Sequence, residues 1–351
     1  MNTTKIDIAN MVLMVLSAIA AFVLPFEVFL FSYAVLGPLH YLTEIGWLHQ
    51  RSYFTNGKKD FYWLLVPCLV LTVISLTFML RDKSVVSPLY GWLSSALGDN
   101  GFSITHALIF GTFAGSLALV WLKDWVYKTI FLIAAFLVGF ALMHEKPFVY
   151  LFGVFLPTLI HVFLFTGLFI LYGALKNKSK TGYASLAVFF LCAISFFVWQ
   201  PQFGFYTVSK RAEEALVSSG FIQLNQSILQ IFNLGQYTYE NVFQSATGLG
   251  IMRFIAFAYT YHYLNWFSKT EVIKWHQVPR LQLAAVIGLW ILSVALYAYD
   301  YYVGLLALYF LSMLHVLLEF PLNYRSIIGI FEESTLLLGW KTPVPVKQKR
   351  K

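Results

Sequence analysis

The chain has 351 residues, of which 59% are hydrophobic and 11% charged, and its formal net charge is +8. Soluble domains carry about a quarter charged residues and less than half apolar ones, so this composition excludes an ordinary water-soluble core and indicates a lipid environment. The basic residues lie in short clusters between apolar runs, which indicates membrane topology and argues against nucleic-acid binding.

Apolar runs divide the chain into predicted transmembrane spans. A helix needs about 20 apolar residues to cross the hydrocarbon core of a bilayer. In chain order, the runs that approach this length are Met11–Leu36, Phe61–Leu80, Ile104–Leu122, Thr129–Met143, Tyr150–Leu175, Tyr183–Trp199, Thr247–Phe267, Leu281–Ala298 and Tyr302–Phe320. The fourth run is short enough to be half-buried or re-entrant. The sequence therefore predicts an all-α, polytopic transmembrane helical bundle of about nine spans, forming a single domain over residues 1–351.

Basic residues between the spans predict the orientation. With nine spans, all the basic loops fall on one side, which the positive-inside rule makes cytoplasmic. These loops carry Arg51, Lys58, Lys59, Lys123, Lys128, Lys176, Lys178, Lys180, Lys269, Lys274 and Arg280. The N-terminus is then predicted outside and the C-terminus inside, where residues 342–351 form a basic cytoplasmic tail. We expect a bacterial inner membrane, with a eukaryotic organelle as the alternative.

Residues 200–246 form the one long polar stretch. Arg211, Glu213 and Glu214 open a segment with amphipathic character, and Gly and Asn punctuate the remainder. The stretch is predicted to cap the outer face of the bundle as a short helix or two.

Two matched pairs of ionisable residues lie on predicted helices. His40 and Glu44 end or follow the first span, and His315 and Glu319 lie in the ninth. In each pair the residues are four positions apart, so on a helix they share one face and can converge on one point. Imidazole and carboxylate groups are ligands of non-haem iron, and also of manganese and zinc. Because ionisable residues are costly within a membrane, these four are candidate functional groups.

Two further histidines lie within spans, His161 in the fifth and His262 in the seventh. In the predicted topology His40, His262 and His315 fall toward the cytoplasmic half, and His161 lies somewhat deeper. Four histidines and two glutamates at similar depth could ligate one or two metal ions. Helical His/Glu pairs build comparable sites in soluble di-iron bundles.

Each of these residues also has a structural interpretation. An intramembrane histidine can simply form a hydrogen bond to another helix, and Glu319 can pair with Arg325 or Lys269 as a clamp. The polar residues expected around the ligands, as substrate contacts or partners of the imidazoles, are Tyr41, Tyr261, Asn265, Lys269, Asn323 and Arg325. Lys269 and Arg325 can also hold a lipid headgroup or a carboxylate. At the ends of spans, however, these residue types are commonly interfacial anchors.

The stretch GPLHYLTE at positions 37–44 resembles the bacterial β-carotene 15,15′-dioxygenase family (Brp/Blh-like). That family consists of polytopic membrane proteins with a Gly/Pro-His motif followed by an acid soon after the first span. Further single histidines on its later helices are taken to bind iron. The resemblance implies that the iron ligands are His40, His161, His262 and His315. Here Tyr41 replaces a small residue of the family's motif and Glu44 replaces its Asp, so the resemblance supports an iron oxygenase more than it supports carotene as the substrate.

Several other classes of site are absent from the sequence, including the P-loop, the GxSxG elbow, the CxxC pair and the histidine boxes of membrane desaturases. The leading hypothesis is a membrane-embedded, metal-dependent oxygenase or oxidoreductase with iron, or alternatively a hydrolase with zinc. Its substrate would be an apolar lipid, isoprenoid or carotenoid that enters from the bilayer, and Glu44 and Glu319 would be ligands or catalytic proton-handling groups. A proton- or ion-coupled transporter and a non-catalytic membrane subunit are the two other hypotheses.

Overall fold

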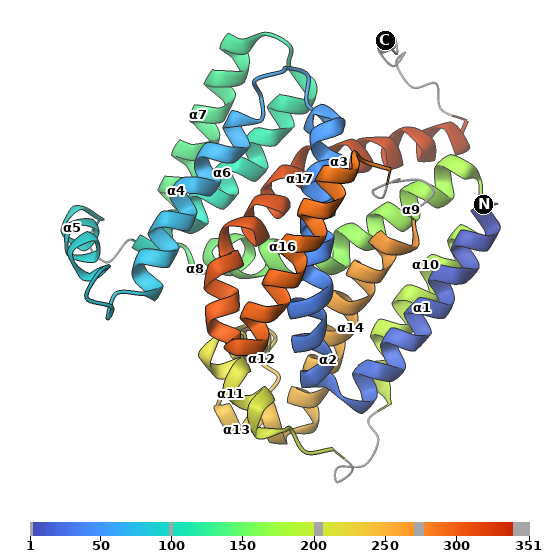
Figure 1. Cartoon of the computed structure of the whole chain (residues 1–351). Coiled ribbons are helices and arrows are strands. Elements are labelled where there is room, and N and C mark those ends of the chain that lie inside the picture. The colour runs from blue at the N-terminus through green and yellow to red at the C-terminus, as the bar shows by residue number, and fades with distance from the viewer. Residues whose placement is uncertain (1–2, 98–100, 200–205, 270–276, 340–351) are drawn as a thin grey trace.

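A computed structural model of the chain describes residues 3–97, 101–199, 206–269 and 277–339, and all regular elements in these ranges are helices (Figure 1). Nine helices of this described part are long and apolar enough to cross a membrane. They are Thr3–Val23, Pro25–Gln50, Tyr62–Met79, Ser103–Trp121, Trp125–Leu142, Lys146–Asn177, Lys180–Val198, Arg280–Tyr299 and Tyr301–Leu337. The predicted all-helical fold is confirmed, and the chain has the architecture of a multi-pass membrane protein.

Some of the long helices consist of several consecutive elements. In chain order the elements are α1 (Thr3–Val23), α2 (Pro25–Phe31), η1 (Ser32–Leu36), α3 (Gly37–Gln50), η2 (Ser52–Phe54), α4 (Tyr62–Met79), α5 (Ser87–Leu97), α6 (Gly101–Trp121), α7 (Trp125–Leu142), α8 (Lys146–Phe148), η4 (Val149–Phe165), α9 (Thr166–Asn177), α10 (Lys180–Val198), α11 (Lys210–Ser218), α12 (Ile222–Ile231), α13 (Tyr239–Gln244), α14 (Ala246–Ser268), α16 (Arg280–Tyr299) and α17 (Tyr301–Leu337). The element η2 is a 3₁₀ turn, whereas η1 and η4 have the wider π-helical hydrogen bonding.

The first predicted span is wrong, because the run Met11–Leu36 contains a break. The helix α1 ends at Val23, Leu24 has a non-helical backbone (φ −135°, ψ 63°), and Pro25 opens α2. Proline lacks the N–H that a helix interior needs, and its ring disfavours a helical conformation for the residue before it. The run therefore belongs to two helices, which are α1 and the continuous rod formed by α2, η1 and α3.

The helix α14 lies in the middle of the bundle, although it is not among the nine apolar helices. It contacts α1, α2, α10, η1 and η4, and most of its residues are buried (Figure 1). Because its neighbours are mainly other helices of the protein, it holds Arg253, His262 and Asn265 without exposing them to lipid. The predicted seventh span, Thr247–Phe267, corresponds to this helix.

The first turn of α1 and the last turn of α17 lie at the same end of the bundle (Figure 1). The predicted topology, with the N-terminus outside and the C-terminus inside, relied on a single span over Met11–Leu36. Dividing that run adds one passage through the bundle, so the opposite placement of the two ends is not supported. The predicted basic tail, residues 342–351, lies outside the described residues.

The polar stretch 200–246 contains three short helices in its described part, namely α11, α12 and α13. They cover the end of the bundle that lies opposite the first turn of α1 (Figure 1). The short fourth predicted span, Thr129–Met143, is a complete helix. It begins at Trp125 because the Asp124 side chain caps it, accepting hydrogen bonds from the backbone N–H groups of Val126 and Tyr127.

Candidate metal centre

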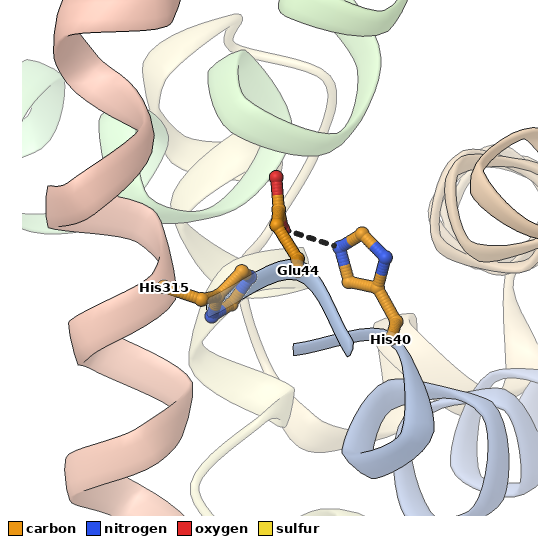
Figure 2. Close-up of side chains that lie close together, drawn as sticks. All are labelled: His40, Glu44 and His315. Atoms are coloured by element: carbon orange, nitrogen blue, oxygen red, sulfur yellow. Dashed lines mark ion pairs between the residues drawn. The ribbon is translucent and has the colours of Figure 1, made fainter. Parts of the chain in front are cut away.

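Two neighbouring helices that run in the same direction, α3 and α17, carry the two predicted His/Glu pairs (Figure 1). The rings of His40 and His315 face each other between these helices, with their centroids 5.5 Å apart. Figure 2 shows both rings together with the Glu44 side chain. One ligand-type atom of each of these three residues lies within 4.8 Å of the others. The sequence motifs at the two positions therefore meet at one place.

The elements η4 and α14 add His161 and His262 to the same place. The ring centroid of His262 lies 4.8 Å from that of His40 and 4.9 Å from that of His161. The ring of His161 is in turn 5.1 Å from that of His315. All four histidines, and both glutamates, expose 7% or less of their surface. Four separate long helices thus contribute to one buried cluster.

Three short contacts between ligand-type atoms lie within this cluster. The His40 Nε2 atom is 3.1 Å from Glu44 Oε2 and 3.2 Å from His262 Nε2. The His161 Nδ1 atom is 3.1 Å from Glu319 Oε2. Each carboxylate therefore contacts one imidazole, and among the described residues Glu319 forms no ion pair with Arg325 or Lys269.

The two imidazole–carboxylate contacts do not satisfy all the groups involved. The 3.1 Å contacts of the Glu44 and Glu319 Oε2 atoms with imidazole nitrogens do not have hydrogen-bond geometry. These two oxygens and both ring nitrogens of His161 are therefore buried without a hydrogen-bond partner in the described part of the chain. Buried polar atoms are normally paired, and exceptions call for an explanation beyond packing. Two buried carboxyl groups that contact no Lys or Arg remain ionised only if positive charge lies nearby. A bound cation would meet both requirements.

The hydroxyl group of Thr166 fixes the proton position on His262. Thr166 Oγ1 donates its single proton to the Val162 carbonyl oxygen at 2.8 Å. The same oxygen lies 2.9 Å from His262 Nδ1 and must therefore accept a hydrogen bond from the Nδ1–H group. The Nε2 atom of neutral His262 then carries a lone pair, and this is the atom that lies near His40. An imidazole whose far nitrogen donates to a fixed acceptor is the usual state of a metal-bound histidine.

The spacing of the ligand-type atoms fits coordination of a common ion. Two N or O ligands at about 2.0–2.2 Å from an ion, with angles of about 90–110° between them, lie about 2.8–3.6 Å apart. The separations of 3.1 and 3.2 Å around His40 Nε2 fall within this range. A set of imidazoles and carboxylates suits iron, manganese or zinc. The donor types of the cluster, and the spacing around His40 Nε2, therefore fit the metal that the sequence predicts.

Widened helical turns position two of the histidines. The π-helical turn η1 ends where α3 begins, and there the Gly37 N–H bonds to the Ser32 carbonyl, five residues back. His161 lies within η4, which also contains Pro157. Turns of this kind are rare and occur frequently at functional sites. Glycine at position 37 also allows a close approach, since a side-chain carbon there would lie 3.3 Å from the Tyr263 hydroxyl on α14.

Two of the residues predicted around the ligands lie close to the cluster. The Tyr41 ring is 5.6 Å from the His315 ring, and its buried hydroxyl has no partner in the described structure. Asn323 lies one turn beyond Glu319 on α17, is 1% exposed, and likewise has both amide atoms unpaired among described residues. The unpaired polar atoms of both residues are therefore available to a ligand or substrate bound at the cluster.

The other predicted neighbours belong elsewhere. The Tyr261 hydroxyl donates to Asn10 Oδ1 on α1 at 3.2 Å, so its side chain points away from His262. Asn265 and Lys269 follow at four-residue steps and line a separate cavity with it. Arg325 binds the Phe54 carbonyl and Asn56 Oδ1, and thereby ties α17 to the turn after α3.

Sequence reasoning did not identify two groups beside the ligands. Thr166 holds His262 from another helix, and no sequence spacing indicates that contact. The Trp266 indole N–H donates to Thr43 Oγ1 at 3.0 Å, and its ring centroid lies 5.4 Å from that of His40. Trp266 is one turn beyond His262 and Thr43 adjoins Glu44, so proximity to ligands along their own helices could have indicated this pair.

Comparisons of the chain with protein-family models, with curated proteins and with solved structures give no match. The resemblance of positions 37–44 to the Brp/Blh-like family therefore stays a prediction.

Proposed function

We propose that the chain is a membrane-embedded, metal-dependent oxidoreductase whose metal is held by His40, Glu44, His262 and His315, with His161 and Glu319 alongside. The observation that carries this proposal is the buried cluster itself. Its carboxylate Oε2 atoms lie 3.1 Å from imidazole nitrogens without hydrogen-bond geometry, and neither carboxylate has a Lys or Arg partner in the described chain. Structural polar groups inside a membrane protein are expected to satisfy one another, and these do not.

Iron is the metal that we propose, and when bound by imidazole and carboxylate groups it would supply activation of dioxygen. The chain contributes the binding and orientation of the ligands. Thr166 keeps the Nε2 lone pair of His262 available, and the Trp266–Thr43 hydrogen bond holds an aromatic wall beside His40. Burial of the six ligand-type residues excludes bulk water from the site.

An apolar lipid or isoprenoid is the substrate class that we propose. A cavity of about 450 Å³ adjoins η4, and Ile160, the chain neighbour of His161, lines it. It is lined only by apolar residues, which include Leu159, Ile160 and Phe163. Leu164 and Phe232 at its rim are 48% and 62% exposed, so a hydrocarbon chain could enter from the bilayer.

We also propose that both ends of the chain are cytoplasmic. The basic loops after α3, α6 and α9 lie at the bundle end that holds the first turn of α1 and the last turn of α17 (Figure 1). The positive-inside rule makes this end cytoplasmic. Tags at both termini should be protected from externally added protease in sealed right-side-out vesicles or spheroplasts. Exposure of either tag would contradict this topology.

Elemental analysis of the detergent-purified protein tests the metal proposal. Wild-type protein should contain one or two equivalents of iron, and His262→Ala and His315→Ala should each lose it, because each removes a ligand. His49→Ala is the matched control. His49 is an exposed histidine that contacts Tyr53, and this variant should keep the wild-type content.

The outcomes separate the candidate reactions. Iron that both cluster variants lose would justify screening lipids and carotenoids for oxygen consumption. Zinc with the same pattern would redirect the screen to hydrolysis. Full metal content in both variants, or no metal in wild-type protein after reconstitution with iron or zinc, would overturn the proposal.

A further inference from the structure

A polar cavity lies away from the candidate metal centre, among α1, α9, α10 and α14. Its volume is about 220 Å³. Ligand pockets for drug-sized molecules occupy about 300–1,000 Å³, so this cavity suits a small polar molecule or a lipid headgroup and not a whole lipid. The charged residues that line it are Asp7 and Lys269. The apolar cavity beside η4, in contrast, has no polar lining.

The positive side of the cavity carries free hydrogen-bond donors. Lys269 follows the last residue of α14, and its side-chain ammonium forms no ion pair or hydrogen bond with a described residue. The Asn265 Oδ1 atom lies 3.4 Å from the Tyr261 hydroxyl as a second, longer contact of that group, and the Asn265 NH₂ group donates to no described residue. An ammonium and an amide donor one helical turn apart are suited to the oxygens of an anion.

The negative side is already fixed in place. Asp7 Oδ2 accepts hydrogen bonds from the hydroxyls of Ser179 at 2.9 Å and Thr181 at 2.7 Å. These contacts hold the carboxylate at the junction of α1 and α10 without a cation in the described part of the chain. Its second oxygen remains available, so the cavity offers one acceptor group and one cationic group to the same ligand.

We infer that this cavity binds a phosphorylated primary amine, with the phosphate near Lys269 and Asn265 and the ammonium near Asp7. The same chemistry occurs in a free phosphoethanolamine and in the headgroup of an aminophospholipid. The inference does not depend on the metal centre, because none of the proposed metal ligands lines the cavity. Gly173 on α9 supplies open space, since a side-chain carbon added there would meet no atom within 4 Å.

Calorimetric titration of the full-length protein in an uncharged detergent tests the inference, with phosphoethanolamine and inorganic phosphate as probes. Lys269→Gln should weaken the binding of both by about 10- to 100-fold, because it removes a charged donor. Asp7→Asn should weaken the binding of phosphoethanolamine but not that of phosphate. Gly173→Leu should abolish both by filling the cavity.

Matched variants control for non-specific effects. Gly288→Leu on α16 also meets no atom within 4 Å and lies outside the cavity, and Lys176→Gln removes an exposed lysine of α9. Both should bind like wild type. Thermal melting should show that Gly173→Leu remains folded, because the leucine replaces a helical glycine in open space.

The results also identify the source of the ligand. Binding that requires prior removal of a co-purified aminophospholipid, absent from Gly173→Leu protein, supports a lipid headgroup. Binding without that step supports a soluble phosphoamine. The inference is overturned by no binding in wild-type protein before or after delipidation, by displacement with glycine but not phosphate, or by Lys269→Gln and Gly173→Leu affinities within about twofold of wild type.

Discussion

His40 on α3 and His262 on α14 point their Nε2 atoms at each other across 3.2 Å. Because the Nδ1–H group of His262 donates a hydrogen bond to Thr166 Oγ1, the Nε2 atom of His262 has no proton and is the acceptor or metal ligand in this contact. The pair joins the first His/Glu motif to a helix that contains no such motif. We therefore expect substitutions next to His262 on α14 to alter the affinity for the proposed metal through this contact.

Thr166→Val should weaken metal binding without removing a ligand. Valine keeps the volume of threonine but has no oxygen to accept the His262 Nδ1 proton. Loss of such a partner typically lowers metal affinity by about 10- to 100-fold. Competition with a chelator of known affinity measures the change. Thr112→Val is the control, since this buried threonine bonds to the Leu108 carbonyl and contacts no proposed ligand. Equal chelator resistance in both variants would show that Thr166 does not act through His262.

Glu44→Gln and Glu319→Gln should reveal whether the cluster holds one ion or two. If two ions bind, each variant should lose about one equivalent of two, because each carboxylate contacts a different imidazole. If one ion binds beside His40, Glu44→Gln should lose it and Glu319→Gln should keep it. Metal content per protein distinguishes these patterns. Full retention in Glu44→Gln would argue against the proposed ligand set in either case.

Arg325→Ala should reduce stability while leaving the metal in place. The guanidinium donates to the Phe54 carbonyl and to Asn56 Oδ1, and Asn56 in turn donates to the Val120 carbonyl. Losing charged hydrogen bonds should lower the free energy of unfolding by about 1.5–3 kcal/mol. Thermal melting in detergent and metal analysis on the same sample measure the two effects. Metal loss at unchanged melting temperature would instead give Arg325 a role at the site.

Phosphate binding at the second cavity should weaken as the pH rises above about 8. Burial lowers the pKa of Lys269 from 10.5 to about 8, while Asp7 opposes the shift. The Lys269 side chain is therefore positively charged below this pH and neutral above it. The affinity for phosphate should then decrease, with the slope approaching about a tenfold loss per pH unit. Calorimetric titration with inorganic phosphate between about pH 8 and 9.5 measures the slope, because inorganic phosphate is already largely a dianion throughout this range. Lys269→Arg should flatten the profile, and an unchanged slope in that variant would exclude Lys269 as the titrating group.

The sequence predicted the all-helical membrane fold and the residues of the cluster because both follow from local chemistry. Apolar length determines the spans, and the cost of burying ionisable groups in lipid singles out the histidines and glutamates. The run Met11–Leu36 was predicted as one span and is two helices, because a count of apolar residues ignores the backbone restriction that Pro25 imposes on Leu24. The predicted placement of the two ends on opposite sides depended on that same undivided span.

Other features could not be read from one sequence. The contact between Thr166 and His262 joins helices far apart in the chain, and only tertiary packing decides it. The widened turns of η1 and η4 change which side chains face a neighbour, so a regular helical wheel misplaces them. Tyr261 and His262 are adjacent, yet one faces α1 and the other the histidine–glutamate cluster, because successive helical residues point about 100° apart.

The low hydropathy of α14 has a consequence for biosynthesis. A segment that carries Arg253, His262 and Asn265 enters a bilayer poorly by itself, since charged and polar residues oppose insertion from the translocon. Its contacts α1, α2 and α10 are all synthesised earlier, so they are available to receive it as it emerges. His315 arrives still later, on α17. Loading of the proposed metal should therefore follow the insertion of α17.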